Sequence, residues 1–225
     1  DWTLNLDELG VGTHDLDITV TDTAGNEESG SFTVTVGTPP TPVITGISAD
    51  TGVSNSDGIT SDHTPTIHGT AQAGHAVDVY LDGIQIGTAL VDLDGQWSLP
   101  HSGQPLDDGS YLITAIAEDP LGNVSLVSLP FALTIDTETS VPTLHQDGET
   151  HDATPTLTGT AEPGAEITVT IGSETWTTTA DNDGHWSVEI VDGLPNGDYD
   201  VIVEATDTAG NTASGDYTLS IDEAL

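Results

Sequence analysis

The chain contains no lysine and no arginine among its 225 residues, whereas it contains 38 acidic residues and has a formal net charge of −38 at pH 7. A surface without cationic side chains cannot contact nucleic-acid phosphates, and an anionic membrane repels it. The carboxylates also have no Lys or Arg with which to form ion pairs. We therefore expect cations as partners, and Ca²⁺ first among them because it prefers oxygen ligands.

Cysteine and methionine are missing as well. Without cysteine there is no disulfide and no thiolate metal site. No apolar run approaches the roughly 20 residues that a membrane-spanning helix needs, and no signal peptide is recognisable. Because the chain lacks an initiating methionine, we expect it to be an internal piece of a longer protein.

Residues typical of short strands and tight turns are abundant, including Thr, Val and Ile together with 25 glycines and 12 prolines. Apolar and polar residues alternate in "DLDITVTD" (15–22), where Leu16, Ile18 and Val20 are expected to face inward. The same alternation occurs at 77–81, 167–171 and 199–203. This regularity predicts an all-β protein and argues against disorder, despite the high charge.

Several stretches recur along the chain. "DGQWSL" (94–99) returns as "DGHWSV" (183–188), and "VTDTAGNE" (20–27) returns as "AEDPLGNV" (117–124) and "ATDTAGNT" (205–212). Judged from the first aspartate of the latter turns, the period is 88 to 97 residues. Such a period indicates tandem domains of one kind.

The recurrence divides the chain into the C-terminal part of one repeat, 1–37, and two complete repeats, 38–138 and 139–225. Each complete repeat holds about seven short strands, which is typical of an immunoglobulin-like β-sandwich. The fragment 1–37 supplies roughly three strands and is too short to close a sandwich by itself. The sequence thus predicts tandem sandwiches arranged as an elongated rod.

Aromatic and histidine residues were considered as binding groups. Trp97 and Trp186 each follow an Asp-Gly pair at the same point of the repeat; we interpret them as core residues, with stacking on a sugar as the alternative. The histidines show no repeated metal-ligand spacing and are interpreted as surface residues: His63, His68, His75, His101, His145, His151 and His185.

Acidic residues gather in the turns that we expect at the junction of the two complete repeats. The candidates from the third repeat and its linker are Asp136, Glu162, Asp181, Asp183 and Asp207, and those from the facing end of the middle repeat are Asp50, Asp57, Asp62, Asp107 and Asp108. Close carboxylates repel, and a Ca²⁺ ion with six to eight oxygen ligands removes the conflict. For any single aspartate the alternative is a purely structural turn, in which Asp and Asn bond their own backbone.

The junction before the middle repeat differs in composition. Gly37 stands where the later junction has Asp136, and Gln72 replaces Glu162, although Asp92, Asp94 and Asp119 remain. Three prolines, Pro39, Pro40 and Pro42, stiffen this linker by fixing φ. We expect a weaker or missing ion here, with proline supplying part of the rigidity.

The pattern "TPTLTGTAEPGAEITVTI … DNDGHWSV … LPNGDYDVIVEATDTAGNTASGDYTLSID" resembles the bacterial Ig-like repeats of giant secreted adhesins. The resemblance implies calcium-dependent, non-enzymatic repeats at the bacterial cell surface, exported by type I secretion, that project a distal binding domain. It also implies ligand roles for the aspartate ending the last strand, Asp136, and for the turn aspartates Asp22, Asp119 and Asp207. The distal ligand would not be contacted by this segment.

Other functions remain open at this point. The chain is alternatively a carbohydrate-binding module, or a subunit of an extracellular filament or matrix in which another chain, or upstream residues, completes 1–37. An acidic surface adapted to salt explains the charge without any specific site. An enzyme with paired carboxylates is disfavoured, because the acids lie in turns rather than in a cleft.

Overall fold

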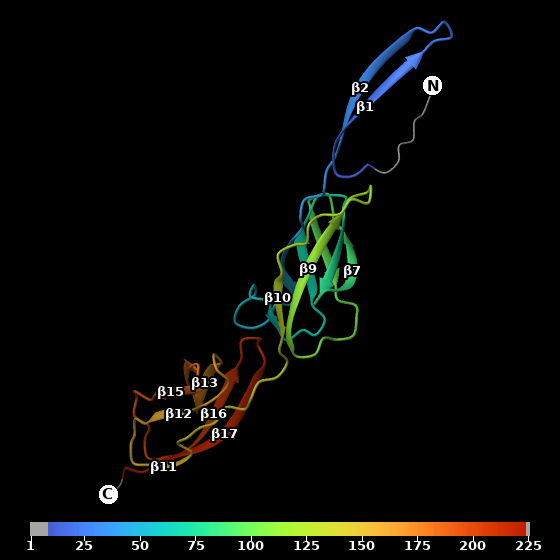
Figure 1. Ribbon diagram of the computed structural model, residues 1–225. Coiled ribbons are helices and arrows are strands. Elements are labelled where there is room, and N and C mark those ends of the chain that lie inside the picture. Colours follow the sequence, from blue (N-terminus) through green and yellow to red (C-terminus); the bar gives the residue numbers. More distant parts are fainter. Residues whose placement is uncertain (1–8, 224–225) are drawn as a thin grey trace.

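The computed structural model describes residues 9–223, so the start of the fragment 1–37, for which roughly three strands are predicted, lies outside the described part of the chain. Within 9–223 every regular element is a β-strand. Figure 1 shows a hairpin at one end, followed by two β-sandwiches in a row. The predicted all-β fold of tandem immunoglobulin-like domains in an elongated arrangement is confirmed.

The leading hairpin consists of β1 (Gly12–Thr21) and β2 (Glu27–Val36), which pair antiparallel along their whole length. The predicted alternation holds in part, because Leu16 and Ile18 are half-buried. Val20, however, is 57% exposed, so its inward placement was wrong. The reason is that among the described residues this hairpin forms a two-stranded sheet of its own, with no second layer to cover that residue.

The middle repeat is a sandwich of a five-stranded and a three-stranded sheet, in the orders β4-β10-β9-β6-β7 and β3-β5-β8. Its strands are β3 (Val43–Ser48), β4 (Ile59–Thr60), β5 (Thr66–Thr70), β6 (Ala76–Leu81), β7 (Ile84–Leu90), β8 (Gln96–Pro100), β9 (Gly109–Glu118) and β10 (Phe131–Ile135). The linker before β3 is anchored, since Pro39 and Pro42 are buried.

The third repeat has the same plan, with sheets β11-β17-β16-β13-β14 and β12-β15. Its strands are β11 (Gly148–Thr150), β12 (Thr156–Thr160), β13 (Glu166–Ile171), β14 (Glu174–Thr179), β15 (His185–Glu189), β16 (Gly197–Thr206) and β17 (Thr212–Ile221). The segment before β11 runs alongside β12 and is hydrogen-bonded to it. The N–H groups of Thr143 and His145 donate to Thr160 O and Thr158 O at 2.7 and 2.8 Å.

The core of each sandwich contains a tryptophan that lies against its paired glycine on the neighbouring strand of the same sheet. Trp97 and Trp186 are only 3% exposed, which confirms their core role and removes both rings as a platform for sugars. Gly159 packs so closely that a Cβ there would lie 2.6 Å from Trp186 Cζ2 and 1.9 Å from Thr143 O. Gly69 has the same relation to Trp97. In both repeats the glycine of a Gly-Thr pair (69–70 and 159–160) therefore packs against the tryptophan of an Asp-Gly-x-Trp motif (94–97 and 183–186). We call this glycine–tryptophan contact the packing unit.

A tyrosine fastens the long central strand of each sandwich. The hydroxyl of Tyr111 donates to Asp107 O at 2.8 Å, and that of Tyr199 donates to Pro195 O at 2.7 Å. A tyrosine that bonds the backbone just upstream of this strand is a hallmark of immunoglobulin-like sandwiches. The sequence interpretation missed this feature, although "GSY" and "GDY" mark it in both repeats.

His75 corrects the expectation that the histidines are surface residues. It is 6% exposed, and its Nδ1 is buried without a hydrogen-bond partner. The corresponding residue of the third repeat is the core alanine Ala165. The alignment of the two repeats contained this signal, because a position that is apolar in one copy is expected to be buried in the other.

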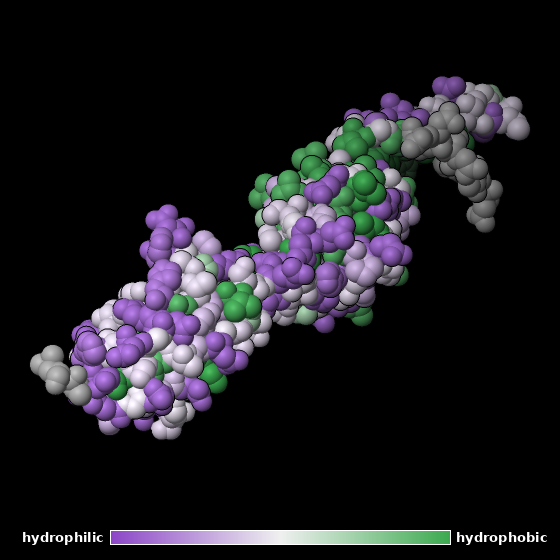
Figure 2. Space-filling view, turned by 90° about the horizontal axis from the view of Figure 1, so that it is seen from below, coloured by the Kyte–Doolittle hydropathy of each residue, from purple (hydrophilic) through white to green (hydrophobic). Residues whose placement is uncertain are grey.

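The outer surface is hydrophilic over much of the third repeat, whereas hydrophobic residues gather on the middle repeat (Figure 2). Exposed apolar side chains there include Leu121, Leu126, Val127 and Leu129. Among residues 9–223, no helix has the length and apolarity needed to cross a membrane.

Candidate functional site

The Asp-x-x-Gly-Asn motif forms one turn geometry wherever it occurs. In the third repeat Asp207 accepts hydrogen bonds from the backbone N–H and the side-chain amide of Asn211 at 2.9 and 2.8 Å. The N–H of Asp207 in turn donates to Asn211 O at 3.0 Å. The same bonds join Asp22 to Asn26 and Asp119 to Asn123. The aspartate therefore locks its own turn, as expected for the structural interpretation.

These bonds stabilise the ionised aspartates. Hydrogen bonds from the side chain and backbone of Asn26 lower the pKa of Asp22. The side-chain amide of Asn123 likewise lowers the pKa of Asp119. A hydrogen bond to the charged form favours that form, so both turns are held most firmly when their carboxyls are deprotonated.

The environment of the turn, rather than its geometry, distinguishes the third repeat. Asp22 is exposed and Asp119 is half-buried, whereas Asp207 is 1% exposed. The covering surface is the end of the middle repeat, because Thr51 Oγ1 donates to Ala209 O at 2.5 Å. The turn of the third repeat is thus enclosed at the junction between repeats.

Asp136 follows β10 at the centre of this junction. Its N–H donates to Thr60 O at 3.0 Å, and its carbonyl accepts the side-chain amide of Asn211 at 2.8 Å. Burial raises the pKa of its carboxyl, a hydrogen bond from the Glu138 N–H opposes this, and the nearby charges of Asp207 and Asp108 raise it further. The junction therefore holds carboxylates that repel each other.

Asp50 and Asp57 form a second acidic pair, in the loop that precedes β4. Asp50 Oδ2 accepts the N–H of Gly58 at 3.1 Å, and Asp57 Oδ1 accepts that of Ile59 at 3.1 Å. Asp50 Oδ1 is buried without a hydrogen-bond partner. Burial raises the pKa of Asp50, the Gly58 hydrogen bond opposes this, and the charge of Asp57 adds to the rise.

Two more predicted residues hold the linker that joins the repeats. Asp108 accepts hydrogen bonds from Thr137 Oγ1 at 2.9 Å and from its N–H at 3.3 Å. Glu162 accepts one from Thr139 Oγ1 at 3.1 Å. Since the two carboxylates come from different repeats, the linker is fixed on both sides. The sequence interpretation did not single out either threonine or Asn211.

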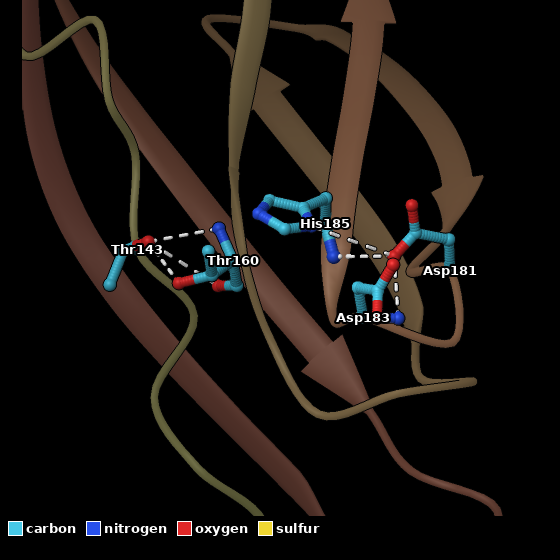
Figure 3. A network of polar contacts seen from close by, with 5 residues as sticks. All are labelled: Thr143, Thr160, Asp181, Asp183 and His185. Carbon is cyan, nitrogen blue, oxygen red and sulfur yellow. Dashed lines mark hydrogen bonds and ion pairs between the residues drawn. The ribbon is translucent and has the colours of Figure 1, made fainter.

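The remaining candidates lie within their own turns. Asp181 accepts the N–H groups of Asp183 and His185, both at 2.9 Å, and its Oδ1 lies 3.8 Å from His185 Nδ1 (Figure 3). These backbone bonds, that of His185 first, lower the pKa of Asp181. Asp92 binds the N–H groups of Asp94 and Gln96 in the same way. The carboxylates of Asp94 and Asp183 are exposed.

The acids at the junction fit a cation by their charge and by the orphaned oxygen of Asp50, but they are distributed over two places. Among residues 9–223 no group of three or more His, Asp or Glu side chains is arranged to hold a metal ion. Asp62 accepts Thr64 N–H at 2.8 Å in a turn of its own. The expected gathering of all junction acids around one point is thus replaced by the Asp136 and Asp50 groups.

Three solved structures are similar to the chain. One, from an Antarctic bacterium, is described as a Ca²⁺-stabilized adhesin that helps it reach out and bind ice; it is 24% identical, covers 94% of this chain and 57% of its own, and has a TM-score of 0.42. A 1.5-MDa bacterial ice-binding adhesin is 23% identical, covers 95% and 76%, and has a TM-score of 0.37. A tetra-tandem repeat from the extending region of a large adhesion protein is 25% identical, covers 94% and 57%, and has a TM-score of 0.40.

The chain therefore spans 57% of the length of the first of these structures. No curated protein matches it significantly. The profile of the bacterial Ig-like domain matches residues 38–137 and 142–223, which are most of both complete repeats. The chain belongs to the bacterial Ig-like domain family.

Proposed function

We propose that these repeats are a spacer segment of a large extracellular bacterial adhesin, which projects a distal binding domain away from the cell surface. The carrying observation is the enclosed junction, at which the turn containing Asp207 is buried against the end of the preceding repeat. A junction of this kind fixes the orientation of each repeat relative to the one before it, so that a series of repeats extends in one direction. The role is structural rather than enzymatic.

Calcium bound at the junction stiffens the spacer in this proposal. The Asp136 group (Asp136, Asp207 and Asp108) would contribute ligands to one ion, and Asp50 with Asp57 to another. Binding would require these side chains to rearrange, because no three acidic side chains among residues 9–223 are placed to hold a metal ion. In each group burial, and after it the charge of neighbouring carboxylates, raises the pKa of one member, Asp136 or Asp50, in a chain without Lys or Arg. A bound Ca²⁺ supplies the missing positive charge.

The magnitude of this effect is large for domains of this size. Extracellular calcium modules bind with Kd of about 10⁻⁴ to 10⁻³ M. At a calcium concentration about 100 times Kd, each site adds roughly 2.7 kcal/mol to the free energy of unfolding. A small domain has a total of only about 5–15 kcal/mol. Low cytoplasmic calcium would thus leave the chain less stable before export, and extracellular calcium would fold and straighten it.

Calcium removal tests this proposal. We expect millimolar Ca²⁺ to raise the melting temperature in circular dichroism and to lengthen and narrow the particle in small-angle X-ray scattering, relative to chelator. Sodium chloride of equal ionic strength is the matched control, since a salt-adapted surface responds to it equally. Identical melting and scattering with and without chelator would contradict the calcium role.

The hairpin favours one alternative, a subunit of a filament or matrix. Val20 and Phe32 on β1 and β2 are exposed, whereas the corresponding residues of the third repeat, Ala205 and Tyr217, are buried and half-buried. Strands from another chain would cover such a face. Light scattering that shows only monomers up to high concentration would exclude this alternative and leave the spacer proposal intact.

A further inference from the structure

The loop between β3 and β4 reaches out of the middle repeat and contacts the turn of the third. Thr51 Oγ1 donates to Ala209 O, and Val53 N–H donates to Thr208 O at 3.4 Å. The Thr51 hydroxyl is itself held by the N–H of Ser61 at 2.9 Å. The contact is therefore anchored in the body of the middle repeat and is made by hydroxyl and backbone groups.

Two glycines allow the backbones to meet. A Cβ on Gly52 would lie 2.0 Å from Thr208 O, and one on Gly210 would lie 2.9 Å from Gly52 N. Both glycines have positive φ, +94° and +90°. Between them Ala209 has 0% exposure. Any larger side chain at these three positions would push the repeats apart.

The three copies of the turn differ at the position of this alanine. The turn of the third repeat reads Asp-Thr-Ala-Gly-Asn, as does that of the hairpin at 22–26, whereas the middle repeat has Asp-Pro-Leu-Gly-Asn. Leu121, which replaces the alanine, is 88% exposed, and a Cβ on Gly122 would meet nothing within 4 Å. The turn geometry is common to all, but only the Ala-Gly form fits against a loop such as 49–54.

The loop is not common to all repeats. In the third repeat the chain before β11 is shorter, and its Asp147 accepts the N–H of Thr218 at 3.0 Å within the same domain. We propose that residues 49–54 are a docking site for the Ala-Gly turn of the repeat that follows, and that the small residue at this turn position determines which repeat can be joined rigidly. This selectivity is separate from calcium and goes beyond the spacer role.

A distance measurement between the two repeats tests this docking site. The chain has no cysteine, so Gln85→Cys and Glu174→Cys, both at exposed positions, accept spin labels without background. Electron paramagnetic resonance would be recorded in chelator and in millimolar Ca²⁺. In both conditions Ala209→Leu and Gly210→Ala should each give a broader distance distribution than the parent chain, because the turn no longer fits the loop.

Matched variants separate docking from strain within the turn. The control for Gly210→Ala is Gly122→Ala, which makes the same substitution at φ +85° in a turn with nothing packed against it. The control for Ala209→Leu is Ala24→Leu, in the exposed turn of the hairpin. Both should leave the distribution narrow, as should Thr51→Ser, which keeps the hydroxyl. Equal widths for Gly210→Ala and Gly122→Ala would overturn the inference. A width that changes with Ca²⁺ but with neither substitution would also overturn it, while leaving the calcium proposal standing.

Discussion

Two groups of aspartate side chains in this chain have opposite electrostatics. Asp181 belongs to the first, in which backbone N–H groups surround an exposed carboxylate and lower its pKa. Asp136 belongs to the second, in which burial and neighbouring charges raise the pKa. The first group stabilises turns in every repeat. At Asp136 one of the neighbouring charges, that of Asp207, comes from the adjoining repeat, and a cation would relieve this repulsion.

Replacement of Asp136 distinguishes the destabilising burial and repulsion of its carboxylate from the role of that carboxylate as a calcium ligand. The pKa of Asp136 is higher in the folded protein than in the unfolded chain, where it is about 3.9. The free energy of unfolding therefore falls as pH rises from the pKa of the unfolded chain through that of the folded protein, and it stays reduced at higher pH. We expect Asp136→Asn to remove this fall, so that in chelator at neutral pH the variant melts higher than the parent chain. In millimolar Ca²⁺ the order should reverse, because a ligand is lost.

The control is Asp200→Asn, which removes one charge from an exposed site on β16. Melting temperatures would be measured from acidic to neutral pH, in chelator and in calcium. If the two variants respond identically in all conditions, Asp136 has no special role at the junction.

Sequence could identify these turns but not their surroundings. The motif of Asp22 and that of Asp207 are the same five residues, Asp-Thr-Ala-Gly-Asn, and both lock their turns as the motif predicts. One is exposed and the other is buried, since within residues 9–223 only the second has another repeat against it. The ion proposed for the junction depends on that difference, which no local pattern encodes.

At the level of elements, each sandwich depends on the close contact between a strand glycine and its paired tryptophan. Alternating residues predicted the long strands well, because Val77, Val79, Ile167 and Val169 all lie in the core. Short elements escaped prediction. β4 has two residues and β11 three, too few for any period to be visible, and both form through pairing with the last strand of their repeat.

Gly159→Ala tests the packing unit. The added methyl group would overlap Thr143 O and the Trp186 ring, and overpacking of this kind costs about 1–3 kcal/mol. For a domain of this size each kcal/mol lowers the melting temperature by about 4–8 °C. Urea and thermal unfolding would measure both quantities.

Gly30→Ala is the matched control, because it lies in a strand and its added Cβ would meet nothing within 4 Å. Its stability should stay close to that of the parent chain. A Gly159→Ala variant as stable as Gly30→Ala would show that the core relaxes around the methyl group and that the contact is not limiting.

For the whole molecule, the two joints differ in construction. The joint after the middle repeat has direct contacts from Thr51 to Ala209 and from Asn211 to Asp136. At the joint before it, Asp92 and Asp119 bond within their own turns, and the linker contains Pro39 and Pro42, both buried. The prediction that proline supplies part of the rigidity at this joint, where Gly37 stands in the place of Asp136, stays a prediction.

Replacing the linker prolines should loosen the first joint alone. With spin labels at Thr19→Cys and Gln85→Cys, the combined change Pro39→Ser, Pro40→Ser and Pro42→Ser is expected to broaden the distance distribution, because serine leaves φ free. The same three substitutions should leave unchanged the distance distribution between spin labels at Gln85→Cys and Glu174→Cys. An unchanged first distribution would mean that other contacts hold this joint.

The short parallel strands give the rod a mechanical property. β4 runs parallel to β10, and β11 runs parallel to β17, so the strand near the entry of each repeat lies beside the strand at its exit. A pull along the rod therefore slides these neighbours past each other. The bonds from Thr134 N–H to Gly58 O and from Asp136 N–H to Thr60 O are loaded together, and they must break at once rather than one by one under tension.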